Sequence, residues 1–241
     1  MTRPITTIAK HFVNLLYPLH CASCGTALDA MNKSCLCPIC EGRIKNNPEP
    51  YCASCGRPMQ SDKRLCAECE RTGFAFDMAR SALLYEGVLK ELIHMFKYRG
   101  KLSLSAVLCE KIILFLKNHR EIIDGADAIL FVPLYNAWLN QREYNHSGIL
   151  ASAISREFGV PVSKALEKKR RTSRQSELSR EERITNLIGL FRVKEGSGLA
   201  GSKVLLVDDV MTTGTTLNEC AKTLKSSGVS EVRCLTLARG V

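Results

Sequence analysis

The chain has 241 residues, of which 45% are hydrophobic, and a formal net charge of +10. At roughly 100–200 residues per domain, this length allows one large domain or two smaller ones with a buried core. No stretch reaches the ~18–20 consecutive apolar residues of a membrane span, and the N-terminal residues lack a signal-peptide cleavage site, so we expect a cytoplasmic protein without a membrane span. The positive charge favours a polyanionic partner such as nucleic acid, a nucleotide or a polyphosphate, although solubility alone explains it equally well.

The first 70 residues are dominated by paired cysteines. Eight of the twelve cysteines form four Cys-x-x-Cys pairs, and the segment Cys-Ala-Ser-Cys-Gly occurs twice, each time followed by a second pair. In a chain expected in the cytoplasm, such pairs favour metal binding over disulfides. The predicted metal ligands are Cys21, Cys24, Cys37, Cys40, Cys52, Cys55, Cys66 and Cys69.

This repeat predicts two structural zinc sites. Zinc takes four thiolates in a tetrahedron, and each Cys-x-x-Cys turn supplies two of them. Ligation by consecutive pairs matches the repeat, while interleaved ligation and an iron–sulfur cluster stay open. Four pairs are more than a thioredoxin-like redox site needs. A site closed by four thiolates keeps a region of about 50 residues with little core folded. Such ribbons also bind nucleic acid or protein, and the sequence favours this binding role and the purely structural role equally.

From residue 74 onward the pattern changes to alternating strands and helices, so we divide the chain into a zinc-ribbon region (1–73) and an α/β domain (74–241). The alternation predicts a mostly parallel sheet flanked by helices, with ligands bound beyond the carboxyl ends of the strands. We expect strands at 79–85, 127–133, 160–162, 203–207 and 231–237. We expect helices at 88–98, 104–118, 147–158 and 215–226, and a charged loop or exposed helix at 167–184.

The segment 204–216, VLLVDDVMTTGTT, predicts a site for ribose 5-phosphate. Its four apolar residues form a buried strand that leads into Asp208 and Asp209, whose carboxylates suit a ribose diol and a magnesium ion. The threonine-rich turn then opens a helix, where backbone N–H groups and the helix dipole favour phosphate. A strand followed by ordinary helix-capping residues explains single positions but not the whole run. The binding residues predicted in the turn are Val210, Met211, Thr212, Thr213, Gly214, Thr215 and Thr216.

This loop resembles the signature of the type I phosphoribosyltransferases, which bind phosphoribosyl pyrophosphate. Nearly the whole chain also resembles the ComF family, in which a cysteine-rich zinc region precedes a phosphoribosyltransferase domain. Further landmarks are Phe96–Gly100, Val132-Pro133, Gln141–Asn145, Arg171-Thr172, Gln175, Glu182-Arg183, Asn186 and Phe191.

The resemblance implies roles for individual residues. The loop after the first core strand and a hood at 168–183 carry arginines that pair with pyrophosphate, and magnesium accompanies the substrate. The implied catalytic residues are Asp208, Asp209, Arg142 and Arg171, and the implied substrate contacts outside the turn are Lys97, Arg174 and Gln175.

Two positions depart from the relatives. Glu143 stands where family members have glycine, which weakens pyrophosphate binding because a carboxylate repels it. Thr212 stands where purine-salvage relatives carry an acid that accepts a proton, which threonine does not do at neutral pH.

Two functions fit these features. The first is magnesium-dependent transfer of phosphoribose to an unidentified nucleophile. The second is a non-catalytic protein that binds single-stranded nucleic acid or senses nucleotides and retains the pocket, with Tyr98 or Trp138 available for stacking. The resemblance to ComF proteins implies a role in competence, with single-stranded DNA and competence proteins as partners. Gluconate or iron–sulfur metabolism, to which some relatives are tied, is a third possibility.

Overall fold

The computed structural model describes residues 19–29, 34–61, 63–134, 144–169 and 189–240. The chain forms two compact units: unit 1 is Met1–Lys45 with Glu86–Val107, and unit 2 is Asn46–Tyr85 with Leu108–Val241. One copy of the cysteine repeat lies in each unit. We call them the first ribbon (Cys21, Cys24, Cys37 and Cys40) and the second ribbon (Cys52, Cys55, Cys66 and Cys69). The division at residue 73 stays a prediction, since these units separate the chain at other positions.

Unit 1 combines the first ribbon with an amphipathic helix. Its elements are α2 (Pro38–Gly42), α4 (Gly87–Tyr98), η1 (Leu102–Leu104) and the first residues of α5 (Ser105–Asn118). Leu89, Leu92, Ile93 and Phe96 recur at intervals of three and four residues, and all four are buried. This spacing places them on one face of α4, which confirms the predicted helix.

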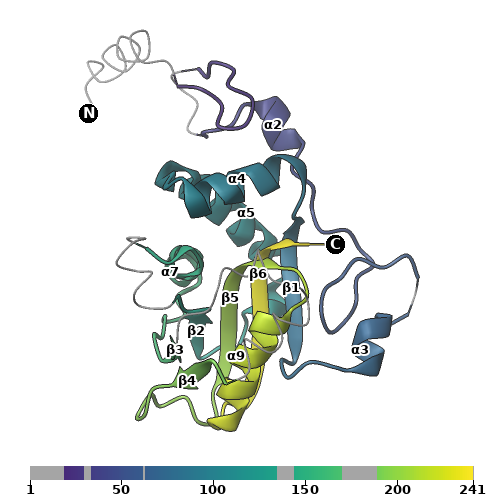
Figure 1. The fold of residues 1–241 in the computed structure, drawn as a ribbon, viewed down its shortest axis with the longest axis vertical. Helices are drawn as coiled ribbons and strands as arrows, with labels where there is room; N and C mark the ends of the chain where they lie inside the picture. The colour runs from purple at the N-terminus through teal and green to yellow at the C-terminus, as the bar shows by residue number, and fades with distance from the viewer. Residues whose placement is uncertain (1–18, 30–33, 62, 135–143, 170–188, 241) are drawn as a thin grey trace. The chain divides into compact units, whose positions relative to one another are not determined.

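Unit 2 is built on a four-stranded parallel sheet with strand order β1-β6-β5-β2 (Figure 1). The strands are β1 (Met78–Leu84), β2 (Ala128–Phe131), β5 (Lys203–Met211) and β6 (Glu231–Arg239). Helix α7 (His146–Phe158) packs on β2 and β5, and α9 (Thr215–Ser226) packs on β5 and β6. Unit 2 also contains α3 (Ala67–Arg71), η2 (Arg120–Ile122), β3 (Leu166–Lys168) and β4 (Phe191–Val193). The predicted parallel α/β architecture is therefore confirmed.

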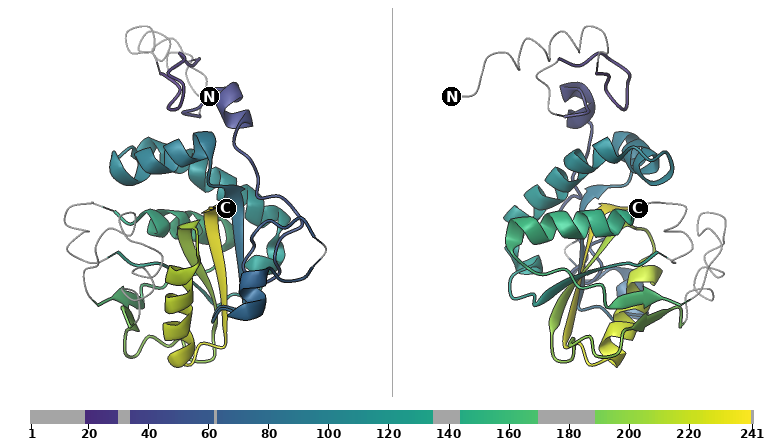
Figure 2. Two further views of the ribbon diagram at one scale, coloured as in Figure 1. Left: turned by 45° about the vertical axis from the view of Figure 1, so that its right-hand side comes forward. Right: turned by 90° about the vertical axis from the view of Figure 1, so that its left-hand side faces the viewer.

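The core covers both faces of the central strand β5. Val204 and Leu206 belong to a buried cluster with Leu217 and Leu224 of α9. Successive side chains of a strand point to opposite faces, so Leu205, which is also fully buried, faces the other side. Figure 2 shows the sheet together with α7 and α9 in two further orientations.

Several segments differ from the sequence-based expectation. The strand expected at 160–162 is reduced to an isolated parallel bridge between Val162 and Ile129. Strand β5 continues past Val207 to Met211, because its backbone stays paired with β6 as far as Arg239. Glu167 and Lys168 were expected in a charged loop or exposed helix, but they belong to β3, which pairs antiparallel with β4. Arg192 of β4 donates to Glu167 at 2.9 Å, so cross-strand charge pairing stabilises this antiparallel strand pair.

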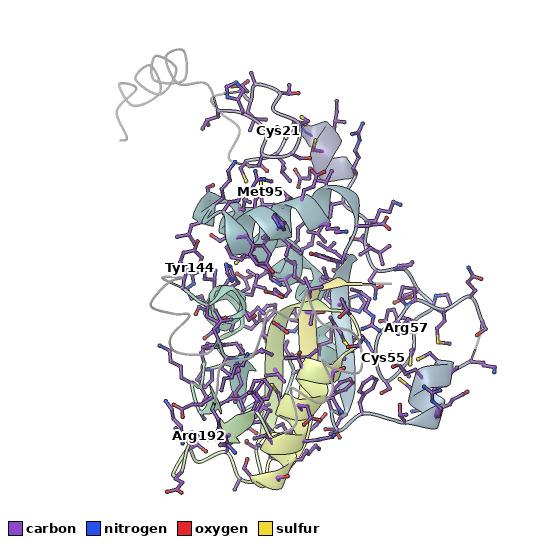
Figure 3. The ribbon with its side chains drawn as sticks, viewed as in Figure 1. Cys21, Cys55, Arg57, Met95, Tyr144 and Arg192 are labelled. Carbon is purple, nitrogen blue, oxygen red and sulfur yellow. The ribbon has the colours of Figure 1, made fainter. Side chains whose placement is uncertain are left out.

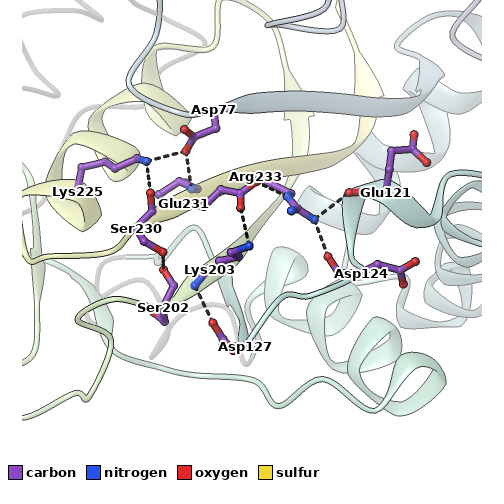
Figure 4. Close-up of polar contacts among 11 residues, drawn as sticks. Asp77, Glu121, Asp124, Asp127, Ser202, Lys203, Lys225, Ser230, Glu231 and Arg233 are labelled. Carbon is purple, nitrogen blue, oxygen red and sulfur yellow. Dashed lines mark hydrogen bonds and ion pairs between the residues drawn. The ribbon is translucent and has the colours of Figure 1, made fainter.

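A polar network joins the strands at the edge of the sheet where they begin (Figure 4). Arg233 donates to the Glu231 carboxylate at 2.7 Å and to the carbonyl oxygens of Glu121 and Asp124 at 2.8 Å each. Asp77 accepts from Val232 N at 2.7 Å. These contacts fix one end of the sheet and leave the carboxyl end of the strands for the predicted site.

Candidate functional site

The adjacent carboxylates Asp208 and Asp209 lie near the carboxyl end of β5. Asp208 Oδ1 accepts hydrogen bonds from Ser147 Oγ at 2.8 Å and from Asp209 N at 2.9 Å. Ser147 is the second residue of α7 and is buried, while Asp209 is only 9% exposed. The Asp208 carboxylate is therefore held in one orientation by a neighbouring helix.

The start of α7 is tied to the end of β2. Asn145 caps the helix by accepting from Gly148 N at 3.0 Å, and its Nδ2 donates to Val132 O at 3.1 Å. The carboxyl ends of β2 and β5 and the N-terminus of α7 thus meet at one edge of the sheet. Ser147 was not singled out from the sequence, because its role depends on which strand the helix packs against. The capping role of Asn145 was not singled out either, although asparagine is a preferred N-cap residue and would have placed the helix start at His146.

The turn between β5 and α9 has a backbone that requires glycine. Gly214 has a φ of +80°, and a Cβ at this position would lie 2.6 Å from Met211 Cε. Thr213 and Thr215 hydroxyls are 2.8 Å apart, and Thr215 N donates to Thr213 Oγ1 at 3.4 Å. The predicted residues 210–216 run from the last two residues of β5 through a turn at 212–214 into the first two residues of α9, a helix of 12 residues. This is an arrangement suited to an anion.

The remaining predicted contacts are not brought to this turn by the described structure. Arg142, Arg171, Arg174 and Gln175 lie outside the described residues, as does Trp138. Lys97 is half-buried in the last turn of α4, which belongs to unit 1. Their roles stay predictions. Of the basic hood, Lys168 and Lys169 are described, and burial lowers the pKa of the Lys168 ammonium group.

The two ribbons have the geometry of tetrahedral zinc sites. In each set the four sulfur atoms lie within 4.8 Å of one another. The Sγ atoms of Cys24 and Cys37 are 3.7 Å apart, and those of Cys55 and Cys66 are 3.8 Å apart. A tetrahedron with zinc–sulfur distances of about 2.3 Å requires sulfurs about 3.8 Å apart. The residues therefore fit structural zinc, and the sets follow consecutive pairs as predicted.

Equivalent backbone hydrogen bonds occur within each of the two ribbons. Gly25 N donates to Cys21 O at 2.9 Å, and Gly56 N donates to Cys52 O at 2.9 Å. Both glycines have positive φ, which glycine adopts readily. The helices α2 and α3 begin directly after the third cysteine of each set. The sequence repeat is thus a structural repeat.

The second ribbon is integrated into the sheet of unit 2. Ala79 N of β1 donates to Ser54 O at 2.7 Å, and Asn47 N donates to Ala82 O at 3.1 Å. These bonds run along the edge of β1 that faces away from β6. Cys52 and Cys55 are buried, and Figure 3 shows Cys55 beside Arg57. In the first ribbon, by contrast, Cys24 is exposed.

Each cysteine set contains a thiol whose pKa is lowered, Cys24 or Cys52, and a thiol whose pKa is raised, Cys40 or Cys55. A hydrogen bond with the Thr26 side chain lowers the pKa of Cys24 to about 6. Burial raises the pKa of Cys55 to about 11, although the Arg239 guanidinium opposes this shift.

Comparison with known families matches both parts of the chain. A model described as "Phosphoribosyl transferase domain" matches residues 146–240, and one described as "Double zinc ribbon domain" matches residues 12–70. Among the described residues, none of the helices has the length and apolar character needed to cross a membrane.

Curated relatives align along most of the chain. Competence protein F from Haemophilus influenzae is 31% identical over 86% of this chain and 91% of its own length. DNA utilization protein YhgH from Escherichia coli K12 is 28% identical, over 85% and 90%. Competence protein ComFC from Bacillus subtilis is 27% identical, over 85% and 84%. The solved orotate phosphoribosyltransferase from Aeropyrum pernix is 17% identical and aligns over 66% of this chain and 68% of its own, with a TM-score of 0.36.

Proposed function

Because the chain belongs to the ComF family, the family of Competence protein F, we propose that it binds phosphoribosyl pyrophosphate with magnesium and acts in DNA uptake during competence. The observation that carries the proposal is the pair Asp208 and Asp209, placed where β5 ends and directly before the turn that opens α9. We place this activity in the cytoplasm, with single-stranded DNA and competence proteins as partners. The names of the curated relatives support the competence role.

Different residues of the site bind different parts of the ligand. Asp208 and Asp209 accept hydrogen bonds from the two ribose hydroxyls, with Asp208 oriented by Ser147. The turn at 212–216 and the N-terminus of α9 bind the 5-phosphate through backbone N–H groups and hydroxyls. Magnesium, when bound, would supply positive charge to the diphosphate, with the carboxylates of this edge as its protein ligands.

Binding is tested by the double variant Asp208→Asn, Asp209→Asn. Phosphoribosyl pyrophosphate with magnesium should raise the melting temperature of the wild type, since a ligand that binds only the folded state stabilises it. The double variant should lose most of this rise, because neutral amides bind the diol and the metal less well. Thermal unfolding at increasing ligand concentration measures the effect.

The matched control removes two carboxylates elsewhere. Asp124 and Asp127 lie at the opposite edge of the sheet, where Asp127 accepts from Lys203 N at 2.8 Å. Asp124→Asn with Asp127→Asn should change the melting temperature of the free protein but keep the ligand-induced rise. Equal rises in the wild type and the Asp208→Asn, Asp209→Asn variant would show that the ribose site is wrongly assigned.

A second function is favoured by Thr212. This residue is exposed in the turn and offers no carboxylate to accept a proton. A protein that binds single-stranded DNA or senses nucleotides without turnover needs no such group. Release of pyrophosphate with any acceptor would support the transferase. The absence of release, together with DNA binding that falls steeply with salt, would favour the binding protein.

A further inference from the structure

The second ribbon contains an unusual concentration of unsatisfied polar atoms. Among the described residues, the buried side-chain nitrogen and oxygen atoms without a hydrogen-bond partner are Asn47 Oδ1, Arg57 Nε, Arg80 Nε, Arg239 Nε and Arg239 Nη1. All four residues contact or belong to the second ribbon: Asn47 donates to Gly56 O at 2.9 Å, and Arg80 donates to Ala53 O at 2.9 Å. The described part of the first ribbon contains no such atom.

Arg239 is the most deeply buried of these side chains. It lies at the end of β6, is 1% exposed, and its Nη2 is 3.9 Å from Cys55 Sγ. A buried guanidinium without a compensating charge is strongly unfavourable, so an opposite charge is expected beside it. A zinc ion with four thiolates carries two surplus negative charges, and Cys55 is one of those thiolates.

Arg239 is also connected to the turn that follows β5. It pairs in register with Met211, and the next residue, Gly240, donates its N–H to Met211 O at 2.9 Å. A Cβ on Gly240 would lie 2.9 Å from Thr212 Cγ2, so the backbone after Arg239 lies directly against the turn. A displacement of Arg239 would therefore move the first residues of the turn.

We propose that Arg239 is the internal counter-cation of the metal site in the second ribbon, and that it links the presence of the metal to the conformation of the turn at 211–216. The identification of this turn as the ribose-phosphate site rests on the function proposed above. The link itself rests on the contacts among Cys55, Arg239 and Met211. The second zinc site is then a support for the turn as well as for its own ribbon.

The first experiment measures zinc release from the full-length, zinc-loaded chain to a chromogenic chelator. Arg239→Met removes the charge but keeps much of the volume, while Arg239→Lys keeps the charge. Loss of a residue that supports metal ligands typically weakens metal binding about 10- to 100-fold. We expect Arg239→Met to accelerate release from the second ribbon by about this factor and Arg239→Lys to fall between it and the wild type.

The matched control is Arg233→Met, in the same strand but at the opposite end. Arg233 is also largely buried, and its partners are Glu231, Glu121 and Asp124 rather than cysteines. In cadmium-substituted protein, Arg239→Met should shift one of the two metal NMR resonances and Arg233→Met neither. Release at the wild-type rate from Arg239→Met, or equal acceleration by Arg233→Met, would overturn the counter-cation role. If Arg239→Met does not fold, Arg239→Lys carries the same comparison.

The second experiment tests the link without any sugar ligand. Hydrogen exchange of the amides at 211–216 is measured in the zinc-loaded wild type, Arg239→Met and Arg233→Met. We expect exchange to increase at least about 10-fold in Arg239→Met alone, in line with the weakened metal site. If Arg239→Met releases zinc faster but exchange at these amides is unchanged, the link to the turn is overturned, while the role of Arg239 as a counter-cation is supported. Because neither readout uses phosphoribosyl pyrophosphate, both outcomes are independent of the proposed function.

Discussion

At the scale of single residues, the two repeat glycines have equivalent backbones and different surroundings. Gly25 has a φ of +75° with open space where a Cβ would stand. Gly56 has a φ of +66°, but a Cβ there would lie 2.7 Å from Ala79 O of β1. The glycine of the motif therefore permits a turn in the first ribbon, and in the second ribbon it also permits close contact with the sheet.

This difference predicts unequal costs of substitution. Gly25→Ala should lower the free energy of unfolding by about 1 kcal/mol, because alanine is strained at positive φ. Gly56→Ala should lower it by about 3 kcal/mol, since the Ala79 carbonyl must also move. Urea unfolding of the zinc-loaded chain measures both, and equal losses would show that the contact with β1 is not tight.

The sequence predicts those site residues that lie next to one another in a single motif. Asp208, Asp209 and Gly214 lie together in the sequence, so strand, acids and turn were recognisable in order. The hydrogen bond from Ser147 to Asp208 joins residues 61 positions apart and depends on how α7 packs on β5. No local pattern encodes such a contact. The role of Arg239 was missed for the same reason, since a single arginine near the end of a strand carries no signal of burial.

At the scale of elements, the N-terminal edge of the sheet is stabilised by charged hydrogen bonds. The hydrogen bond from Arg233 lowers the pKa of Glu231 from its ordinary value of 4.5. A carboxyl whose pKa is lowered by folding contributes stability above its unfolded pKa. That contribution is lost as the pH falls through the lower, folded-state pKa.

Glu231→Gln should therefore destabilise the protein in a pH-dependent way. At pH 7 we expect a loss of roughly 0.5–1 kcal/mol, because the pair is only partly buried. The difference from the wild type should shrink as the pH falls below about 4.5, where the unfolded chain begins to bind the proton, and should vanish once the pH has passed the lower pKa of the folded carboxyl. Thermal unfolding between pH 7 and pH 3 measures it, and a constant difference across this range would contradict the assignment.

The elements themselves were largely predictable, and the exceptions share a cause. The helix at 215–226 and the strands β1, β2 and β6 follow from hydrophobic periodicity and from glycines at their ends. Strand β5 is longer than its apolar segment, because pairing with β6 holds polar residues in extended form. Strand β3 was missed because two of its three residues are charged and its stability comes from pairing with β4. Tertiary pairing overrode local composition in both cases.

At the scale of the whole molecule, the sulfur geometry predicts a metal content. Purified protein should contain about two zinc ions per chain, one for each four-cysteine set. Elemental analysis of protein prepared without added metal measures both the number and the element. One zinc per chain would contradict two independent sets, and iron at about two to four atoms per set would indicate a cluster instead of zinc.

The position of the second ribbon along β1 has a further consequence for the behaviour of the chain in solution. An uncovered edge strand presents free N–H and C=O groups that recruit strands from other molecules, and proteins cover such edges by several devices. Here the cover is a metal-folded segment that hydrogen-bonds to Ala79 and Ala82. Stripping the metal would loosen that cover and open the sheet to intermolecular strand pairing. We therefore expect removal of zinc from this ribbon to promote aggregation of the chain.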